Sequence, residues 1–363
     1  MRRRRLKTDR RWAKTSSVCF DGTGNQIRAS GNTNVVRGYD MLVHDLTDRQ
    51  ISYYDPGVGT DPAIGTYAPV SQFVSRILGI AFGIGLRAKL AQAYTYLIER
   101  WQPGDHIFIF GFSRGALCAR GLAGLLNSVG MLRPGSANLV PYAVSLYAQS
   151  CARWSPDRWD QLHSFTRTLA RRQDGKVAIP IAYLGLWDTV SAPGIFKRSM
   201  QWPYAPSVPN ASAGRHAVPI DEKRRPYREY LITPLGDQRL VDEAWFAGIH
   251  SDIGGDYPDD DRLSDIALKW VIEGAAEHGL VLNTEKYQRY CSVEPTYAMG
   301  EIHRVSWLWI LLTFRRRRIP DGAWIHASVA DRIAEDESYR PRLPEHTTVI
   351  DAQWASPETD IRI

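Results

Sequence analysis

The chain has 363 residues, of which 44% are hydrophobic and 23% are charged, a composition typical of globular proteins. Residues 1–11 hold seven cations and one acid, which together account for the whole formal net charge of +6. Because the rest of the chain is close to neutral, a nucleic-acid partner is not expected, and residues 1–14 are predicted to form a basic disordered tail.

Signals for a membrane span, a secretory leader and a zinc site are weak. The longest apolar run, residues 77–86, has ten residues with three glycines, too short for a membrane-spanning helix. No apolar segment follows the basic tail, as a normal secretory signal requires. The four cysteines lack zinc-site spacing, and Cys19 and Cys118 fall in apolar runs typical of a core. We therefore expect a protein made in a reducing cytoplasm.

The first half of the chain alternates between strand and helix patterns. Short apolar runs at residues 17–20 and 51–54 predict strands, and residues 71–100 have a helical pattern. Residues 106–110 are apolar on both faces, as in a central parallel strand. A helix rich in small residues is predicted at 115–126.

The second half repeats this alternation, which favours an α/β fold with a mostly parallel sheet and helices on both faces. Strands are predicted at residues 177–187 and 243–249, and a helix at 263–278. Residues 131–175 and 192–240 are predicted to be long insertions over the carboxyl ends of the strands.

The motif at residues 111–115, Gly-Phe-Ser-Arg-Gly, predicts a nucleophilic serine. A serine hydroxyl needs a base and a fixed geometry to attack, and a strained turn between strand and helix supplies that geometry. Ser113 follows an apolar strand and precedes a helix, which is the context this motif requires. The fold is therefore predicted to be of α/β-hydrolase type, with the main domain at 15–335 and a C-terminal extension at 336–363.

The acid and the base are expected after later strands, in the order serine, acid, histidine. Asp188 closes the strand after the first insertion and is the predicted acid; its alternative role is a turn former. His250 ends the next strand and is the predicted base. His326 is the alternative base and His216 a third candidate, and the histidine not used as base is expected to form a core hydrogen bond.

The oxyanion donors are predicted at two turns. The backbone N–H of Arg114 would start the helix after the nucleophile. The glycine-rich loop at 21–25 follows the first strand, and its Thr23 or Gly24 N–H is the second candidate. The alternative for this loop is a tight turn held by Asp21 and Asn25, and both descriptions can hold together.

These motifs resemble the α/β-hydrolase-like family that includes the phospholipase effectors of type VI secretion systems. The resemblance runs in order through residues 20–25, 33–35, 54–60, 103–105, 111–116, 185–190, 216–217, 221–225, 245–255 and 326–329. It implies a Ser–Asp–His hydrolase with Ser113 and Asp188 in place, a phospholipid or other ester substrate, and no required cofactor. It also implies a secretion-system or immunity partner and export without a cleavable signal.

Residues 305–314 are apolar and aromatic and precede four arginines at 315–318. This pairing suits peripheral contact with an anionic membrane through Trp307, Trp309, Arg315 and Arg316. The alternative is a buried helix or strand with a solvated basic end.

Two other classes of function compete with a serine esterase. In a metal-dependent phosphoesterase, Asp21, Asp188, His250, Asp252 and Asp256 would gather at the strand ends around Mg²⁺ or Ca²⁺. A structural or regulatory Ca²⁺ or Mg²⁺ held by Asp21 or Asp252 beside a serine site is a milder form of the same hypothesis. The third class is a non-catalytic interaction protein on a hydrolase fold.

Overall fold

The computed structural model describes residues 13–22, 27–44, 49–57, 79–150, 156–190, 202–236, 239–305 and 314–356. Most of the predicted basic tail and the first part of the helix predicted at 71–100 lie outside these residues. None of the described helices combines the length and the apolar character that crossing a bilayer requires.

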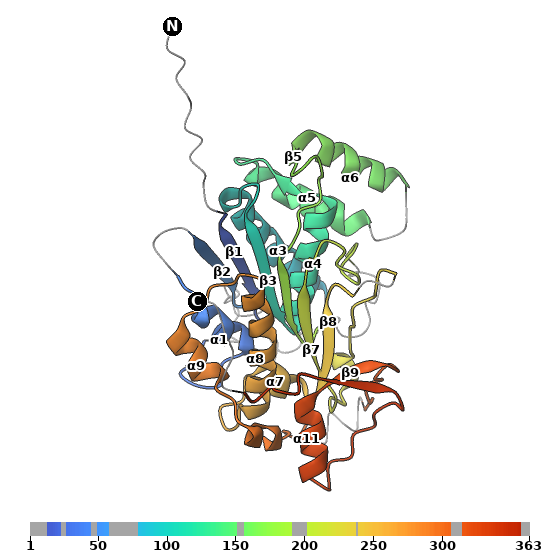
Figure 1. Cartoon of the computed structure of the whole chain (residues 1–363). Helices are drawn as coiled ribbons and strands as arrows, with labels where there is room; N and C mark the ends of the chain where they lie inside the picture. The colour runs from blue at the N-terminus through green and yellow to red at the C-terminus, as the bar shows by residue number, and fades with distance from the viewer. Residues whose placement is uncertain are drawn as a thin grey trace, which may run out of the picture.

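One sheet of eight parallel strands organises the chain (Figure 1). From one edge to the other its order is β10-β9-β8-β7-β6-β3-β1-β2. The strands are β1 (Thr15–Phe20), β2 (Gln50–Asp55), β3 (His106–Phe112), β6 (Tyr183–Trp187), β7 (Gly214–Pro219), β8 (Asp242–Phe246), β9 (Ala323–His326) and β10 (Thr347–Ile350). The order reverses between β1 and β3, and in such sheets ligands bind at the carboxyl ends beside this reversal.

Helices cover both faces of the sheet, as predicted (Figure 1). One face carries α3 (Gly79–Arg100), α4 (Arg114–Ser128) and α5 (Val140–Ser150), and the other α1 (Asn34–Met41), α8 (Arg262–Glu277) and α9 (Thr284–Cys291). The remaining elements are β4 (Met131–Leu132), α6 (Pro156–Leu169), β5 (Ala170–Arg171), α7 (His250–Gly254), α11 (Ala327–Glu335) and short 3₁₀ turns at Ala137–Leu139, Arg225–Tyr227 and Pro295–Met299.

The central strand β3 shows why two helical layers form. Ile107 and Ile109 point into the cluster with α3 and α4, whereas Phe108 and Phe110 point into the cluster with α8. Successive strand side chains face opposite sides, so a continuous apolar run needs cover on both. The prediction of a central strand here is confirmed.

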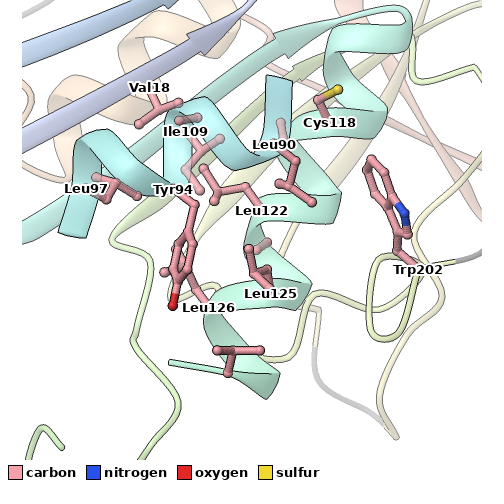
Figure 2. Packing of buried hydrophobic residues seen from close by; sticks show 14 of the residues in the cluster. Val18, Leu90, Tyr94, Leu97, Ile109, Cys118, Leu122, Leu125, Leu126 and Trp202 are labelled. Carbon is pink, nitrogen blue, oxygen red and sulfur yellow. The ribbon is translucent and has the colours of Figure 1, made fainter. Parts of the chain in front are cut away.

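The core between β3, α3 and α4 is closely packed. Figure 2 shows Ile109 and Leu122 together between the helices, with Trp202 against the outer side of α4. A Cβ atom at Gly121 would lie 1.9 Å from the Trp202 ring, so α4 needs a glycine where this indole packs. Cys19 and Cys118 are buried and free, which confirms their predicted place in the core.

Two features differ from the predicted boundaries. Residues 214–219, inside the predicted insertion 192–240, form β7 in the middle of the sheet, because Arg215, His216 and Pro219 interrupt the apolar pattern of a strand. The predicted C-terminal extension 336–363 contributes β10 to the sheet edge.

The first insertion, 131–175, does not cover the carboxyl ends of the strands. Arg171 donates to the carbonyl oxygens of Ile98 and Trp101 at 2.9 and 3.0 Å. Ile98 lies in the last turn of α3 and Trp101 directly follows this helix, just before β3 begins; Figure 1 shows α5 and α6 at the end of the sheet where β1 starts. This insertion therefore packs at the opposite end of the sheet from the serine motif.

Candidate active site

Ser113 lies on the turn between β3 and α4, at the carboxyl end of the sheet. Its backbone has φ 60° and ψ −122°, a strained conformation for a non-glycine residue. A Cβ atom at Gly111 would come within 2.7 Å of the Ala116 backbone, and one at Gly115 within 2.2 Å of the Phe20 carbonyl oxygen. Both glycines of the motif are therefore required for the turn to close against α4 and β1.

His250 reaches Ser113 from the first residue of α7, after β8. Its Nε2 lies 2.8 Å from the Ser113 Oγ, and its Nδ1 lies 2.5 Å from an oxygen of Asp188. With Nδ1 donating to the carboxylate, Nε2 has a free lone pair to accept the serine proton. The imidazole is fixed between two aromatic rings. Its centroid lies 4.6 Å from that of Phe112 and 4.7 Å from that of Tyr227, which it meets edge-on.

Asp188 follows β6 and is fully buried. Its backbone also has a positive φ, 37°, and its N–H donates to the Ala217 carbonyl of β7. Besides His250, the carboxylate receives two hydrogen bonds from the guanidinium of Arg317, at 2.6 and 2.8 Å. The predictions from sequence did not include Arg317, because a run of four arginines is typical of a solvated surface.

Electrostatics favour an ionised Asp188 and a neutral His250. Burial alone would raise the pKa of Asp188, but the Arg317 charge and the hydrogen bond from His250 hold it below the ordinary value. Burial lowers the pKa of His250, against the opposing pull of Asp188 and of Glu222. A neutral imidazole beside a serine hydroxyl is the state that a general base needs.

Glu222 supports the histidine from its backbone side. A carboxylate oxygen of Glu222 accepts from the His250 N–H at 3.2 Å, and Arg224 pairs with the same carboxylate. Burial would raise the pKa of Glu222, but the hydrogen bonds and charge of Arg224 hold it low. The start of α7 is thereby tied to the segment that follows β7.

The other two histidines considered as bases have different partners. His326 ends β9, where its Nδ1 lies 2.8 Å from the Ser328 Oγ and its Nε2 lies 3.1 Å from Asp351. His216, on β7, donates to Glu243 and accepts from the Thr189 N–H. Neither has a hydrogen bond to Ser113 among the described residues, so of these three histidines His250 is the one that reaches the serine.

The predicted oxyanion donors are described in part. Arg114 is the first residue of α4, so its N–H lies beside the serine at the start of the helix. Thr23 and Gly24 lie outside the described residues. The loop start at Asp21 and Gly22 does reach the elbow, since a Cβ at Gly115 would also lie 2.5 Å from the Asp21 carbonyl oxygen. Burial lowers the pKa of the Arg114 side chain to about 10, which still leaves it charged at neutral pH.

The carboxylates of the metal hypothesis each have protein partners. Asp21 accepts from the Thr33 and Tyr54 hydroxyls and from the Gly22 N–H. Asp252 accepts from His303 and from the Ile249 N–H, and Asp256 pairs with Arg28. Among the described residues, these carboxylates do not form a group with the spacing of metal ligands.

Among the residues described, one group of three side chains has the spacing of metal ligands. Ligand atoms of Asp259, Glu301 and His303 lie within 4.8 Å of one another. Asp259 and Glu301 are exposed, and His303 is also hydrogen-bonded to Asp252. The group does not include Asp21 or Asp252, the predicted cation contacts.

The predicted membrane-contact segment is described only at its end. Trp307 and Trp309 lie outside the described residues. Arg315 donates its backbone N–H to the Lys223 carbonyl, and the exposed Arg316 lies 5.9 Å from the Phe314 ring centroid. Membrane contact by these arginines stays a prediction.

Comparison with known proteins gives one family and a few relatives. A family model described as the type VI secretion system phospholipase effector Tle1-like catalytic domain matches residues 14–274. An uncharacterized protein of Saccharomyces cerevisiae, YEL023C, is 30% identical over 230 residues, which are 61% of this chain and 33% of the yeast protein.

Two solved structures resemble the chain at low identity. An uncharacterized protein from Pseudomonas aeruginosa has a TM-score of 0.48 and 21% identity, covering 79% of this chain and 50% of its own. A Tle1 effector bound to the VgrG spike of the type VI secretion system has a TM-score of 0.37 and 20% identity, covering 68% of this chain and 51% of its own. The chain thus spans about a third of its curated relative and about half of these solved chains.

Proposed function

Because this chain belongs to the family of type VI secretion phospholipase effectors with a Tle1-like catalytic domain, we propose that it is a serine hydrolase that cleaves carboxylic esters of phospholipids. The observation that carries the proposal is the hydrogen-bonded series Ser113–His250–Asp188 at the carboxyl end of the sheet. The bond that we propose it cleaves is an acyl ester, as in phospholipases of the A type.

The proposed reaction has two acyl-transfer steps. The Ser113 Oγ attacks the ester carbonyl carbon while His250 Nε2 accepts its proton, and Asp188 stabilises the imidazolium. His250 then gives that proton to the leaving alkoxide oxygen, which departs as an alcohol. Water attacks the acyl-serine with His250 again as base, which releases the fatty acid and restores the Ser113 hydroxyl.

The oxyanion of each tetrahedral intermediate would be held by backbone donors. The Arg114 N–H at the start of α4 is the first, and the helix dipole favours negative charge there. The loop at 21–25 is proposed to supply the second, because its described part, Asp21 and Gly22, follows β1 beside the elbow. These donors act most strongly on charge that develops in the transition state.

The test compares wild type with Ser113→Ala. We expect a fluorophosphonate probe to label wild type only, and mass spectrometry of phospholipid vesicles to show free fatty acid and lysophospholipid with wild type only. Labelling that persists in Ser113→Ala would contradict the nucleophile. Unlabelled wild type whose phosphoester hydrolysis is lost in EDTA would favour the metal-dependent alternative.

Two further proposals concern ions and partners. A regulatory cation would act without being required, so EDTA should leave probe labelling intact and change at most the rate.

Family membership also motivates a secretion-system partner for this chain. Co-purification of the full chain with a spike protein from the same genome would support it, and no co-purification under conditions that retain hydrolase activity would count against it.

A further inference from the structure

Arg317 is a buried cation in a basic run whose other members are half-buried (Arg315) or exposed (Arg316 and Arg318). From Phe314 to Pro320 the residues alternate between exposed and half-buried, and Arg316 and Arg318 are on the exposed side. The side chain of Arg317 is only 2% exposed. The alternation is that of an extended segment, in which every second side chain turns inward.

The inward guanidinium ends on the carboxylate of Asp188. One terminal nitrogen lies 2.6 Å from Oδ1, and the other lies 2.8 Å from Oδ2, the oxygen that also accepts from His250. Two parallel hydrogen bonds fix the plane of a carboxylate, which a single bond cannot do. The guanidinium is itself held by the Tyr227 carbonyl at 2.6 Å.

We propose that Arg317 is a positioning residue of the Ser113 site, which fixes the plane of the Asp188 carboxylate and weakens the hold of the His250–Asp188 pair on a proton. The inference deepens the proposed hydrolase function and rests on it. Arg317 reaches no atom of Ser113 in the described hydrogen bonds, so it acts through Asp188.

The charges around His250 explain the second effect. The negative charge of Asp188 is balanced by Arg317. On the side of the His250 backbone, the charge of Glu222 is balanced by Arg224. The Tyr227 ring meets the His250 ring edge-on. The carboxylate of Asp252, two residues after His250 in the chain, is hydrogen-bonded to His303. Protonation of His250 therefore adds a charge to a buried site whose carboxylates are already neutralised, which is less favourable than beside an unpaired aspartate.

This balance has a consequence for the working range of the enzyme. A histidine that binds its proton weakly stays neutral, and so remains a base, at lower pH. Removal of the Arg317 charge makes the pair hold its proton more tightly. The acidic limb of activity should then move to higher pH.

The test uses Arg317→Met, Arg317→Lys and the matched control Arg318→Met, which removes the neighbouring exposed cation. For Arg317→Met we expect the acidic limb of kcat/KM on a soluble p-nitrophenyl ester to rise by about one pH unit or more. Arg317→Lys should keep the limb near its original pH but lower kcat by about tenfold, because an ammonium cannot form two parallel bonds. Arg318→Met should match wild type.

A second measurement needs no substrate. The downfield proton NMR signal of the His250 Nδ1–H bond to Asp188, followed against pH, reports protonation of the pair directly. A titration that is the same in wild type and Arg317→Met overturns the inference, whether or not the ester is hydrolysed. Unlabelled wild type with a shifted titration would instead defeat the hydrolase proposal alone. If Arg317→Met does not fold, Arg317→Gln gives the same comparison with a neutral donor.

Discussion

Among the described residues, two buried histidines each contact a serine and an aspartate, and only His250 has the arrangement that the proposed reaction requires. His250 accepts from Ser113 with Nε2 and donates to Asp188 with Nδ1. His326 has the opposite arrangement, in which Nδ1 accepts from the Ser328 N–H and lies by the Ser328 Oγ, and Nε2 donates to Asp351. The same three residue types therefore do not by themselves specify chemistry.

The difference lies in the backbone around each serine. Ser113 has a strained φ of 60° between a strand and a helix, and its hydroxyl faces the buried imidazole of His250. Ser328 lies in the first turn of α11, where it and His326 cap the helix locally. Asp188 is fully buried and fixed by Arg317, whereas the side chain of Asp351 is 30% exposed. The group around Ser113 is held together by residues far apart in the sequence, which is typical of a functional site. The group around His326 is held mainly by residues close in the sequence, which is typical of a helix cap.

Replacement of each histidine by alanine should show the largest difference between the two serine–histidine–aspartate groups. His250→Ala should lower kcat by about 10⁴-fold, because the serine loses its base, and should also lower the unfolding free energy, because a buried ring between Phe112 and Tyr227 is lost. His326→Ala should leave kcat per folded molecule unchanged but cost about 3 kcal/mol of unfolding free energy, since a fully buried ring stacked on Phe246 is lost. Probe labelling and urea denaturation measure the two effects. Loss of labelling in His326→Ala alone would reverse the assignment.

Replacement of the two aspartates should give the same contrast, with a large loss of kcat for Asp188 and little loss for Asp351. Asp188→Asn should lower kcat by about 10³-fold or more and also destabilise the fold by about 3 kcal/mol, because Arg317 is left buried without its counter-charge. Asp351→Asn should change kcat little and cost about 1 kcal/mol, since its carboxylate is partly solvated. Equal rates for the two variants would show that Asp188 does not orient the base.

Much of this contrast could be predicted from sequence, and the part that could not has a physical reason. Ser113, Asp188 and His250 each directly follow a strand pattern, so their meeting at one edge of a parallel sheet was predictable. His326 also follows a strand, and nothing local distinguishes it from a base. Only its neighbours, Ser328 and Asp351, show it to be a cap and core residue.

Arg317 and β7 were not predictable for different reasons. Four consecutive arginines carry no local mark of which one turns inward, because that depends on the register of an extended segment against Lys223 and Tyr227. Strand β7 contains Arg215, His216 and Pro219, which disguise its central place. His216 serves there to hold the Thr189 N–H next to the acid. Polar residues that support a site thus hide the strand that carries them.

The serine pair gives a smaller effect on stability. Ser328→Ala removes a hydroxyl that contacts the buried His326 and should cost about 1 kcal/mol, with kcat unchanged. Its counterpart Ser113→Ala removes a hydroxyl that contacts the buried His250 but does not cap α4, so it should cost no more than Ser328→Ala. Urea denaturation of both variants checks this. A larger destabilisation by Ser113→Ala would mean that the hydroxyl supports the fold as well as the proposed chemistry.

The smallest expected difference between the two groups is in how pH changes the unfolding free energy, because His250 and His326 contribute to it with the same sign. Burial lowers the pKa of His326, as it does that of His250, so the unfolded chain binds protons more readily than the folded protein near and below pH 6.5. Their contribution to stability is complete above that pH and is lost as the pH falls through the lowered folded values. His326→Gln should therefore show a shallower decline in unfolding free energy between pH 7.5 and pH 5 than wild type, although it starts lower. The acidic limb of kcat/KM, in contrast, should not move in this variant, because His250 is the one of these two histidines that contacts Ser113. A limb that moved with His326→Gln would couple the cap to the site and remove the distinction between the two groups.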